Sequence, residues 1–155
     1  MILSYVTGYS TADFITKADE ELTSDQQDEI FANADRVAAG EPLTRVLGVR
    51  EFWGLDFKVT PDVLDPRADT ETLVEVVLRF ISQQADMPSR PRACAHGDKK
   101  ISILDLGTGT GCIPIALLSE LPHANAVAVD LSSEALKVAQ ENAARHNVQD
   151  RITFK

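Results

Sequence analysis

The period of the hydrophobic pattern changes most clearly in the C-terminal third of the chain. Residues 101–106 form a short apolar run with β-branched side chains, which is typical of a buried strand. Residues 112–121 are apolar on nearly all sides, which predicts a helix buried against a sheet, with Pro114 in its first turn. Residues 127–129 predict a second strand, and residues 151–155 begin a third. This alternation of strands and helices predicts an α/β fold.

The N-terminal part of the chain follows a helical period. We expect short helical segments within residues 1–20, interrupted at Gly8. Ser24 and Gln27 have the spacing of a capping box, in which each side chain bonds the backbone of the other residue at a helix start. The helix that follows closes at Gly40. Its apolar residues recur at helical spacing and are expected to pack within a small helical domain; they are Ile30, Phe31, Ala34, Val37 and Ala38.

The middle of the chain predicts a β-hairpin followed by a helix. Apolar and polar residues alternate on both sides of Gly54, over residues 51–59, as in two strands joined by a tight turn. Residues 64–72 then form a polar turn, in which Asp69 or Thr70 can cap the next helix. The apolar face of that helix is expected to comprise Leu73, Val76, Val77, Phe80 and Ile81.

A polar, proline-rich stretch at residues 85–100 predicts a loop. It contains Cys94 and His96, two residue types that bind metals. A zinc site needs a second pair of ligands at a suitable spacing, and none accompanies this pair. We therefore expect no metal site.

Three glycines at alternate positions mark the most informative turn. Gly107, Gly109 and Gly111 lie between the first predicted strand of the C-terminal part and its helix, where backbone N–H groups and a helix N-terminus face a ligand. The third glycine of the dinucleotide fingerprint is replaced by Cys112, and no Gly-Lys-Ser/Thr phosphate loop follows. A cofactor with a ribose and an amino-acid portion but no phosphates fits this pattern: S-adenosylmethionine. A tight turn that binds no ligand is the alternative.

Two carboxylates accompany the glycines and favour the cofactor. Asp105 ends the first of these strands, and Asp130 ends the next one, 25 residues later. This is near the spacing at which an acidic residue after a second strand binds the two ribose hydroxyls. Ser132 is then expected to cap the following helix.

Composition restricts the class of protein. A chain of 155 residues corresponds to about one domain, and a net charge of −9 argues against nucleic acid as the main partner, because phosphate binding depends on Lys and Arg. No apolar run approaches the roughly 18 residues of a membrane span, and no signal peptide is visible at the N-terminus. Two cysteines do not imply a disulfide framework. We expect a cytoplasmic protein that binds no membrane.

Four segments, in this order, carry a resemblance to a known family. They are Gly-Glu-Pro at 40–42, Gly-Val-Arg-Glu-Phe-Trp-Gly at 48–54, Pro-Arg-Ala-Asp-Thr-Glu at 66–71 and Asp-Leu-Gly-Thr-Gly-Thr-Gly at 105–111. The chain resembles the release factor glutamine methyltransferases (PrmC, also called HemK). The glycine motif is shared by class I methyltransferases in general, whereas the second and third segments are specific to this family and its near relatives.

The resemblance implies a fold, a domain organisation and an activity. The implied fold is a Rossmann-like class I S-adenosylmethionine-dependent methyltransferase domain, incomplete here. The implied domains are a helical substrate-recognition domain at 1–48, a β-hairpin linker at 49–62 and the first half of the methyltransferase domain at 63–155. The implied reaction methylates the side-chain amide of the glutamine in the Gly-Gly-Gln motif of peptide chain release factors.

Site residues follow from the same resemblance. Arg67, Asp69 and Thr70 are expected to shape the substrate side of the site. The family usually has an apolar residue in place of Asp65 and proline in place of Ala68, so this loop differs here. The residues expected to bind the cofactor are Asp105, Gly107, Thr108, Gly109, Thr110, Gly111 and Asp130.

The family's Asn-Pro-Pro-Tyr motif, which orients the glutamine amide, does not occur in the 155 residues. We therefore assign no catalytic residue and expect the chain alone to be inactive. Two alternatives are a ribosomal-protein glutamine methyltransferase and a non-catalytic fragment that binds a partner. A nucleic-acid adenine methyltransferase is disfavoured by the negative charge. An open parallel sheet would also expose a strand edge, so self-association is a further expectation.

Overall fold

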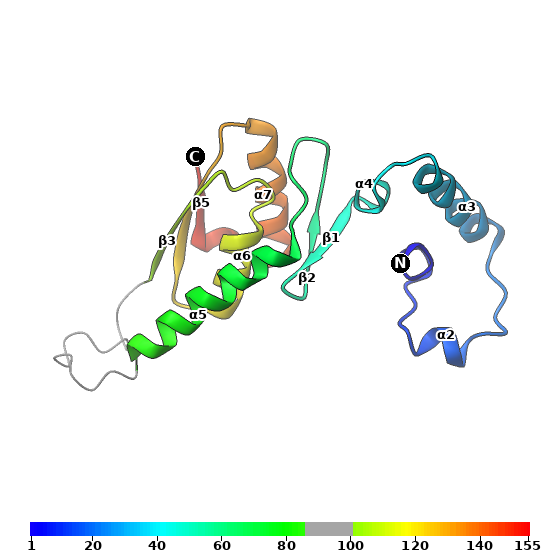
Figure 1. Cartoon of the computed structure of the whole chain (residues 1–155), viewed down its shortest axis with the longest axis horizontal. Coiled ribbons are helices and arrows are strands. Elements are labelled where there is room, and N and C mark those ends of the chain that lie inside the picture. The colour runs from blue at the N-terminus through cyan, green and yellow to red at the C-terminus, as the bar shows by residue number, and fades with distance from the viewer. Residues whose placement is uncertain (86–100) are drawn as a thin grey trace. The chain divides into compact units, whose positions relative to one another are not determined.

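A computed structural model of the chain describes residues 1–85 and 101–155 (Figure 1). The predicted loop, with Cys94 and His96, therefore lies outside the described residues except at Ala85, which ends a helix. The chain divides into two compact units, Met1–Gly48 and Val49–Lys155, which are described separately. No helix in the described ranges is long and apolar enough to cross a membrane.

The first unit is helical. It contains α1 (Ile2–Thr7), α2 (Asp13–Thr16), α3 (Ser24–Ala38) and α4 (Leu43–Leu47). Helix α1 ends before Gly8, as predicted. The predicted capping box is wrong by one residue: Gln26 donates its backbone N–H to Thr23 Oγ1 (3.3 Å), and the Thr23 N–H donates to Gln26 Oε1 (3.0 Å). Thr23 and Ser24 are both good caps, and Thr23 has the extended conformation that an N-cap requires.

Helix α3 packs against α1 and α4 through a narrow stripe. Ile30, Ala34 and Val37 are half-buried, in agreement with the predicted face. Phe31 and Ala38 are exposed, Phe31 to 66%. The prediction that the whole stripe serves packing is therefore wrong for these two residues, because the two short neighbouring helices cover only part of it.

The second unit begins with the predicted β-hairpin. Strands β1 (Val49–Phe52) and β2 (Leu55–Lys58) pair antiparallel, with Phe52 opposite Leu55. Trp53 and Gly54 form the two-residue turn with φ of 56° and 70°, and two positive φ values suit the right-handed twist of the strands. The two phenylalanines of the hairpin, Phe52 and Phe57, are buried and meet edge to face at 6.1 Å.

The rest of the second unit is a parallel α/β sheet, as predicted. Its strands are β3 (Ser102–Leu106), β4 (Asn125–Val129) and β5 (Ile152–Phe154), in the order β3-β4-β5. Helix α6 (Cys112–Glu120) connects β3 to β4, and α7 (Ser133–Arg145), followed by the short 3₁₀ helix η3 (Gln149–Arg151), connects β4 to β5. Because right-handed crossovers that advance in one direction place their helices on one face, α6 and α7 cover the same side of the sheet (Figure 1).

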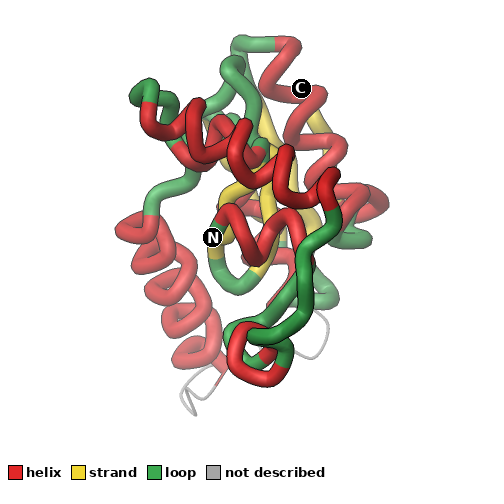
Figure 2. The backbone as a smooth tube through the Cα atoms, turned by 90° about the vertical axis from the view of Figure 1, so that its right-hand side faces the viewer, coloured by secondary structure: helices red, strands yellow, loops and turns green. Residues whose placement is uncertain are grey.

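The hydrophobic core lies around α6. This helix is buried over most of its surface, as predicted, and Pro114 lies in its first turn, where a missing N–H is tolerated. Strand β2 contacts α7, so the hairpin adds Phe52 and Phe57 to the core; burial of each contributes roughly 1.5–3 kcal/mol. In the tube of Figure 2 the helices are red and the strands are yellow. The core residues are Phe52, Phe57, Val74, Cys112, Ile115, Ala116, Leu117, Leu118, Ala124, Ala126, Ala128, Ala143, Val148 and Ile152.

Helix α5 (Glu71–Ala85) follows the short 3₁₀ helix η1 (Ala68–Thr70) and packs against α6. The predicted apolar face of α5 is confirmed for Val77 and Ile81, which are half-buried, and wrong for its other three residues. Val74 is wholly buried, whereas Leu73, Val76 and Phe80 are 49%, 55% and 60% exposed. The apolar residues surround so much of this helix that spacing alone did not identify the face that meets α6.

The sheet face opposite α6 and α7 is exposed. Successive side chains of a strand point to opposite faces, and Leu104 and Leu106 are 65% and 71% exposed, whereas Ile103 between them packs against the core. In the described part of the chain, no strand pairs with the free edge of β3.

Candidate functional site

The glycine turn lies where two parallel strands end side by side. Leu106, the last residue of β3, is paired with Val129, the last residue of β4. The backbone N–H groups of Gly107 and Thr108 both donate to the Val129 carbonyl, at 2.8 and 3.0 Å. The turn that follows β3 is therefore fixed to the end of β4. Open α/β sheets bind ligands beyond the carboxyl ends of their strands, at this kind of location.

Gly111 is required by both conformation and packing. It precedes α6 with φ of 78°, in the left-handed region, and its N–H donates to the Thr108 carbonyl at 2.8 Å. A Cβ atom at Gly111 would lie 3.0 Å from Ile115 Cδ1 and 3.2 Å from Ala139 Cβ. Any side chain would separate the turn from α7, so glycine permits a close approach of the two.

Asp130 connects the glycine turn to the start of α7. Its Oδ2 accepts the Gly109 N–H at 2.8 Å, and its Oδ1 accepts the Ser132 N–H at 3.0 Å. Ser132 then caps α7 as predicted, because its hydroxyl accepts the Ala135 N–H at 3.1 Å. One carboxylate thus holds both the turn after β3 and the loop after β4.

These contacts favour the charged form of Asp130. The Ser132 N–H, followed by the Gly109 N–H, lowers the pKa of the Asp130 carboxyl from its ordinary value, because both hydrogen bonds stabilise the carboxylate. Each oxygen of this ionised group still has capacity for a further hydrogen bond, because a carboxylate oxygen has two lone-pair sites.

Two buried polar atoms beside the turn have no hydrogen-bond partner among the described residues. They are Oδ2 of Asp105, at the end of β3, and Oγ1 of Thr108, in the turn itself. A buried polar group without a partner is unfavourable by about 1–3 kcal/mol. Such groups are rare in folded proteins and indicate a site for a ligand or an ordered water.

Cys112 lies beside the turn but is unsuited to nucleophilic chemistry. Burial raises the pKa of its thiol, so the reactive thiolate form is disfavoured at neutral pH. No group of His, Cys, Asp and Glu side chains in the described ranges could hold a metal ion. The arrangement is suited to binding a small polar molecule.

The residues predicted to line the substrate side are distant in sequence from the glycine turn and form no hydrogen bond with it among the described residues. Arg67 and Asp69 are exposed, and the Thr70 N–H donates to the Arg67 carbonyl at 2.9 Å. Asp69 and Thr70 lie inside η1, directly before α5, so a capping role at the start of α5 stays a prediction. Within the described segments, no hydrogen bond or ion pair joins these three residues to the glycine turn.

The hairpin is attached to the helices by contacts that the sequence pattern did not indicate. The Trp53 N–H donates to Glu71 Oε1, and its indole donates to Glu120 Oε1, both at 3.0 Å. Asn142 of α7, whose side chain is fully buried, was not predicted either. The signal for Asn142 was available: this polar residue is three positions after Ala139, which places it beside the apolar face of the predicted helix.

Two family models and several curated proteins match this chain. Residues 1–48 match the PrmC N-terminal domain model, and residues 97–155 match a methyltransferase domain model. The release factor glutamine methyltransferase of Agrobacterium fabrum is 40% identical over 98% of this chain and 49% of its own length. The chain is thus similar to release factor glutamine methyltransferases over nearly all of its own length.

Two further relatives show similar identity. The Coxiella burnetii release factor glutamine methyltransferase is 39% identical over 97% of this chain and 49% of its own length. A bifunctional methyltransferase of Rickettsia conorii is 37% identical over 98% of this chain and 31% of its own length. The chain thus spans about half the length of the release factor glutamine methyltransferases that it matches.

The lowered pKa of Asp130 predicts a pH dependence of stability. A carboxyl whose pKa is lower in the folded chain stabilises the fold above its unfolded pKa, and this contribution is lost as the pH falls through the folded pKa. The difference in free energy of unfolding between the wild type and Asp130→Asn should be constant near neutral pH and shrink below about pH 4.

This difference can be measured by urea unfolding at a series of pH values, followed by fluorescence of Trp53, the single tryptophan. Asp150→Asn is the control, since it removes an exposed carboxylate that accepts none of the hydrogen bonds described here. If the difference in free energy of unfolding between the wild type and Asp130→Asn does not change with pH, the hydrogen bonds to Asp130 do not stabilise its charged form, and the prediction is wrong.

Proposed function

We propose that this chain binds S-adenosylmethionine at the glycine turn, as part of an enzyme that methylates the glutamine amide in the Gly-Gly-Gln motif of peptide chain release factors. The observation that carries the proposal is the junction of the Gly107–Gly111 turn with Asp130 at adjacent strand ends. It occurs in a chain whose relatives in several bacteria are named release factor glutamine methyltransferases.

The chemistry of the turn fits this cofactor. S-adenosylmethionine carries an ammonium, a sulfonium and two ribose hydroxyls, which are cations and hydrogen-bond donors. Asp105 offers a buried carboxylate oxygen without a partner, Thr108 offers a hydroxyl, and Asp130 retains acceptor capacity for the ribose. A dinucleotide cofactor is disfavoured because Cys112 replaces the third glycine of the dinucleotide fingerprint.

We infer that the remaining cofactor contacts come from the backbone of the turn, with Thr110 at its buried side. The bound cofactor supplies an electrophilic methyl group. An amide nitrogen is a weak nucleophile, because its lone pair is delocalised into the carbonyl. The protein must therefore act chiefly by holding donor and acceptor in position, and the residues of this chain hold the donor.

The proposed organisation follows the predicted boundaries. Residues 1–48 would recognise the substrate, residues 49–62 would form the linker hairpin, and residues 63–155 would form the first half of the methyltransferase domain. Arg67, Asp69 and Thr70 would line the substrate side. An enzyme that acts on release factors would work in the cytoplasm, without contact to a membrane or direct contact to nucleic acid.

Binding of S-adenosylhomocysteine tests the cofactor site. Calorimetric titration of the 155-residue chain should show binding, and Asp130→Ala should weaken it at least about tenfold, because hydrogen bonds to a charged group are lost. Glu134→Gln is the matched control: it neutralises a nearby acid whose carboxylate contacts the hydroxyls of Ser132 and Ser133. Equal affinity of the wild type and Asp130→Ala would remove the proposed role of Asp130.

A surface of the first unit suggests where a release factor would bind. Leu3, Leu22, Ile30 and Phe31 line a pocket together with Glu21 and Gln27, and Phe31 is 66% exposed. An exposed aromatic side chain beside such a pocket is typical of a protein-binding surface. We infer that Phe31 contacts the release factor.

Titration of the chain with a purified release factor that has an intact Gly-Gly-Gln motif should therefore show binding, weakened about tenfold by Phe31→Ala. Phe80→Ala is the control, because Phe80 in α5 is 60% exposed. Binding of a ribosomal protein in place of the release factor would favour the alternative substrate. Binding of a release factor without any binding of S-adenosylhomocysteine would favour a non-catalytic partner-binding role.

We also infer that β3 mediates self-association. Its free edge presents unpaired backbone groups, and Leu104 and Leu106 beside it are more than half exposed. Light scattering should give a mass above that of one chain, and lysine at positions 104 and 106 (Leu104→Lys with Leu106→Lys) should restore the monomer. A monodisperse wild-type monomer with a cooperative thermal transition would contradict self-association.

A further inference from the structure

Asn142 connects two parts of the second unit that are far apart in sequence. It lies on α7 and is the only polar residue among the buried residues of that helix, with none of its surface exposed. Its neighbours on the buried face are alanine and valine residues. Burial of an amide is unfavourable unless its hydrogen bonds are satisfied, so the partners of Asn142 determine what it does.

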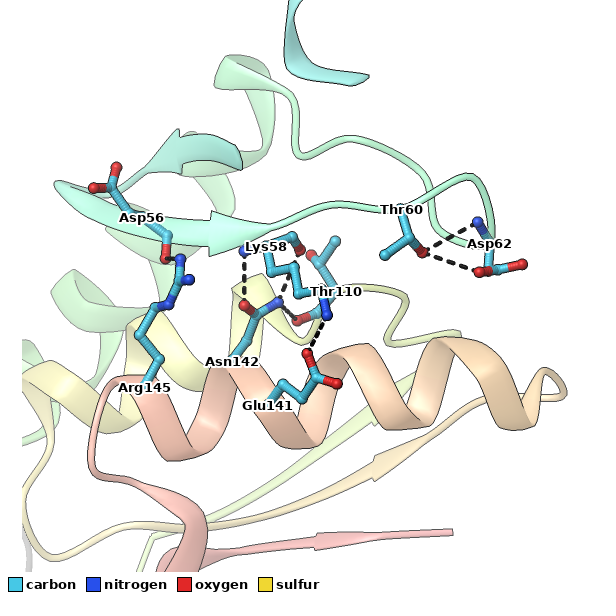
Figure 3. A network of polar contacts seen from close by, with 8 residues as sticks. All are labelled: Asp56, Lys58, Thr60, Asp62, Thr110, Glu141, Asn142 and Arg145. Atoms are coloured by element: carbon cyan, nitrogen blue, oxygen red, sulfur yellow. Dashed lines mark hydrogen bonds and ion pairs between the residues drawn. The ribbon is translucent and has the colours of Figure 1, made fainter. Parts of the chain in front are cut away.

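All partners of the Asn142 amide are backbone atoms (Figure 3). Its Oδ1 accepts the Lys58 N–H at 2.7 Å, and its Nδ2 donates to the Lys58 carbonyl at 3.1 Å, so the side chain pairs with β2 much as another strand would. The same Nδ2 donates to the Thr110 carbonyl at 2.9 Å. Both amide hydrogens are used, one for the hairpin and one for the glycine turn.

The other contacts between the hairpin and α7 do not reach the turn. Lys58 Nζ forms an ion pair with Glu141, and Arg145 and His146 contact the Asp56 carbonyl at 3.2 and 3.0 Å. Among the described residues, Asn142 is therefore the only side chain hydrogen-bonded to both the hairpin and the glycine turn. The positions of Asp56, Lys58, Thr110, Glu141, Asn142 and Arg145 are shown in Figure 3.

The turn has little freedom to adjust by itself. Thr110 lies between Gly109, whose N–H is bound by Asp130, and Gly111, which is in close contact with Ala139 of α7. Ala139 and Asn142 are three positions apart and thus lie on one face of the helix. A shift of Lys58 would move the Asn142 amide, and with it the Thr110 carbonyl.

We propose that Asn142 is a positioning residue that makes the conformation of the glycine turn depend on the docking of the hairpin. The hairpin begins at Val49, directly after the first unit, so it is the covalent connection to the unit with the proposed substrate surface. Strain on the hairpin is thus transmitted to the turn through one amide. The expected effect on cofactor affinity rests on the proposed function. The coupling between the hairpin and the conformation of the glycine turn does not.

Amide hydrogen exchange in the 155-residue chain tests the coupling without any ligand. Asn142→Ala should accelerate exchange at Lys58 and Gly111 about tenfold, relative to exchange at Ile115 in the core of α6. Glu141→Ala, which removes only the neighbouring ion pair, should leave Gly111 unchanged. Exchange at Gly111 that is unaffected, or accelerated by no more than exchange at Ile115, would overturn the proposal.

A second variant approaches the link from the hairpin and leaves Asn142 in place. Gly54 has φ of 70° and no atom near its missing Cβ, so Gly54→Ala strains the hairpin turn without a steric clash with another element. This variant should accelerate exchange at Gly111 relative to Ile115, and Asn142→Ala should abolish that effect in the double variant. An unchanged rate at Gly111 in Gly54→Ala would overturn the coupling, even if Asn142→Ala alone did not fold.

Titration of the same variants with S-adenosylhomocysteine separates the coupling from the proposed function. Gly54→Ala should weaken binding several-fold although Gly54 lies in the hairpin, and Glu141→Ala should not. If Gly54→Ala binds S-adenosylhomocysteine as tightly as the wild type does, the inference that the hairpin influences cofactor affinity is overturned. Absence of binding by the wild type would contradict the proposed cofactor, while the exchange rates would still decide the coupling.

Discussion

The pairing of β3 with β4 is the constraint on which the site depends. Their register ends both strands at one level, with Leu106 opposite Val129, and the Val129 carbonyl accepts the first two N–H groups of the glycine turn. Asp130, the next residue after β4, is thereby held beside Gly109. A slip of one residue would place Asp130 on the opposite face, because side chains alternate along a strand.

The sequence predicted most of this arrangement for a physical reason. A turn with three glycines, and a carboxylate at the end of each of two apolar strands, leave few ways to connect parallel strands, so the turn and Asp130 were placed correctly from spacing alone. The hairpin was equally predictable, because the turn at Trp53 and Gly54 follows a clear alternation of apolar and polar residues.

Two of the wrong predictions concern the residue that caps α3, where two neighbouring residues have similar chemistry, and the buried face of α5, which packing determines. Thr23 and Ser24 can both cap a helix, and the backbone of α3 begins so that Thr23 does. In α5, apolar residues occupy several faces, and contact with α6 selects Val74 over Leu73. Neither choice is encoded in helical period. Tertiary contact determined the second outcome, and a single sequence contains no direct record of such contact.

Asn142 shows how one buried polar residue adds information that a hydrophobic pattern lacks. An alanine at this position would continue the apolar face of α7, yet it would leave the backbone of Lys58 and the Thr110 carbonyl without their partners. An apolar core tolerates small shifts between elements, whereas an amide with all its hydrogen bonds satisfied accepts one geometry. The hairpin, α7 and the glycine turn are therefore held in a single relative arrangement, and the turn can be as well ordered as the helix on which it rests.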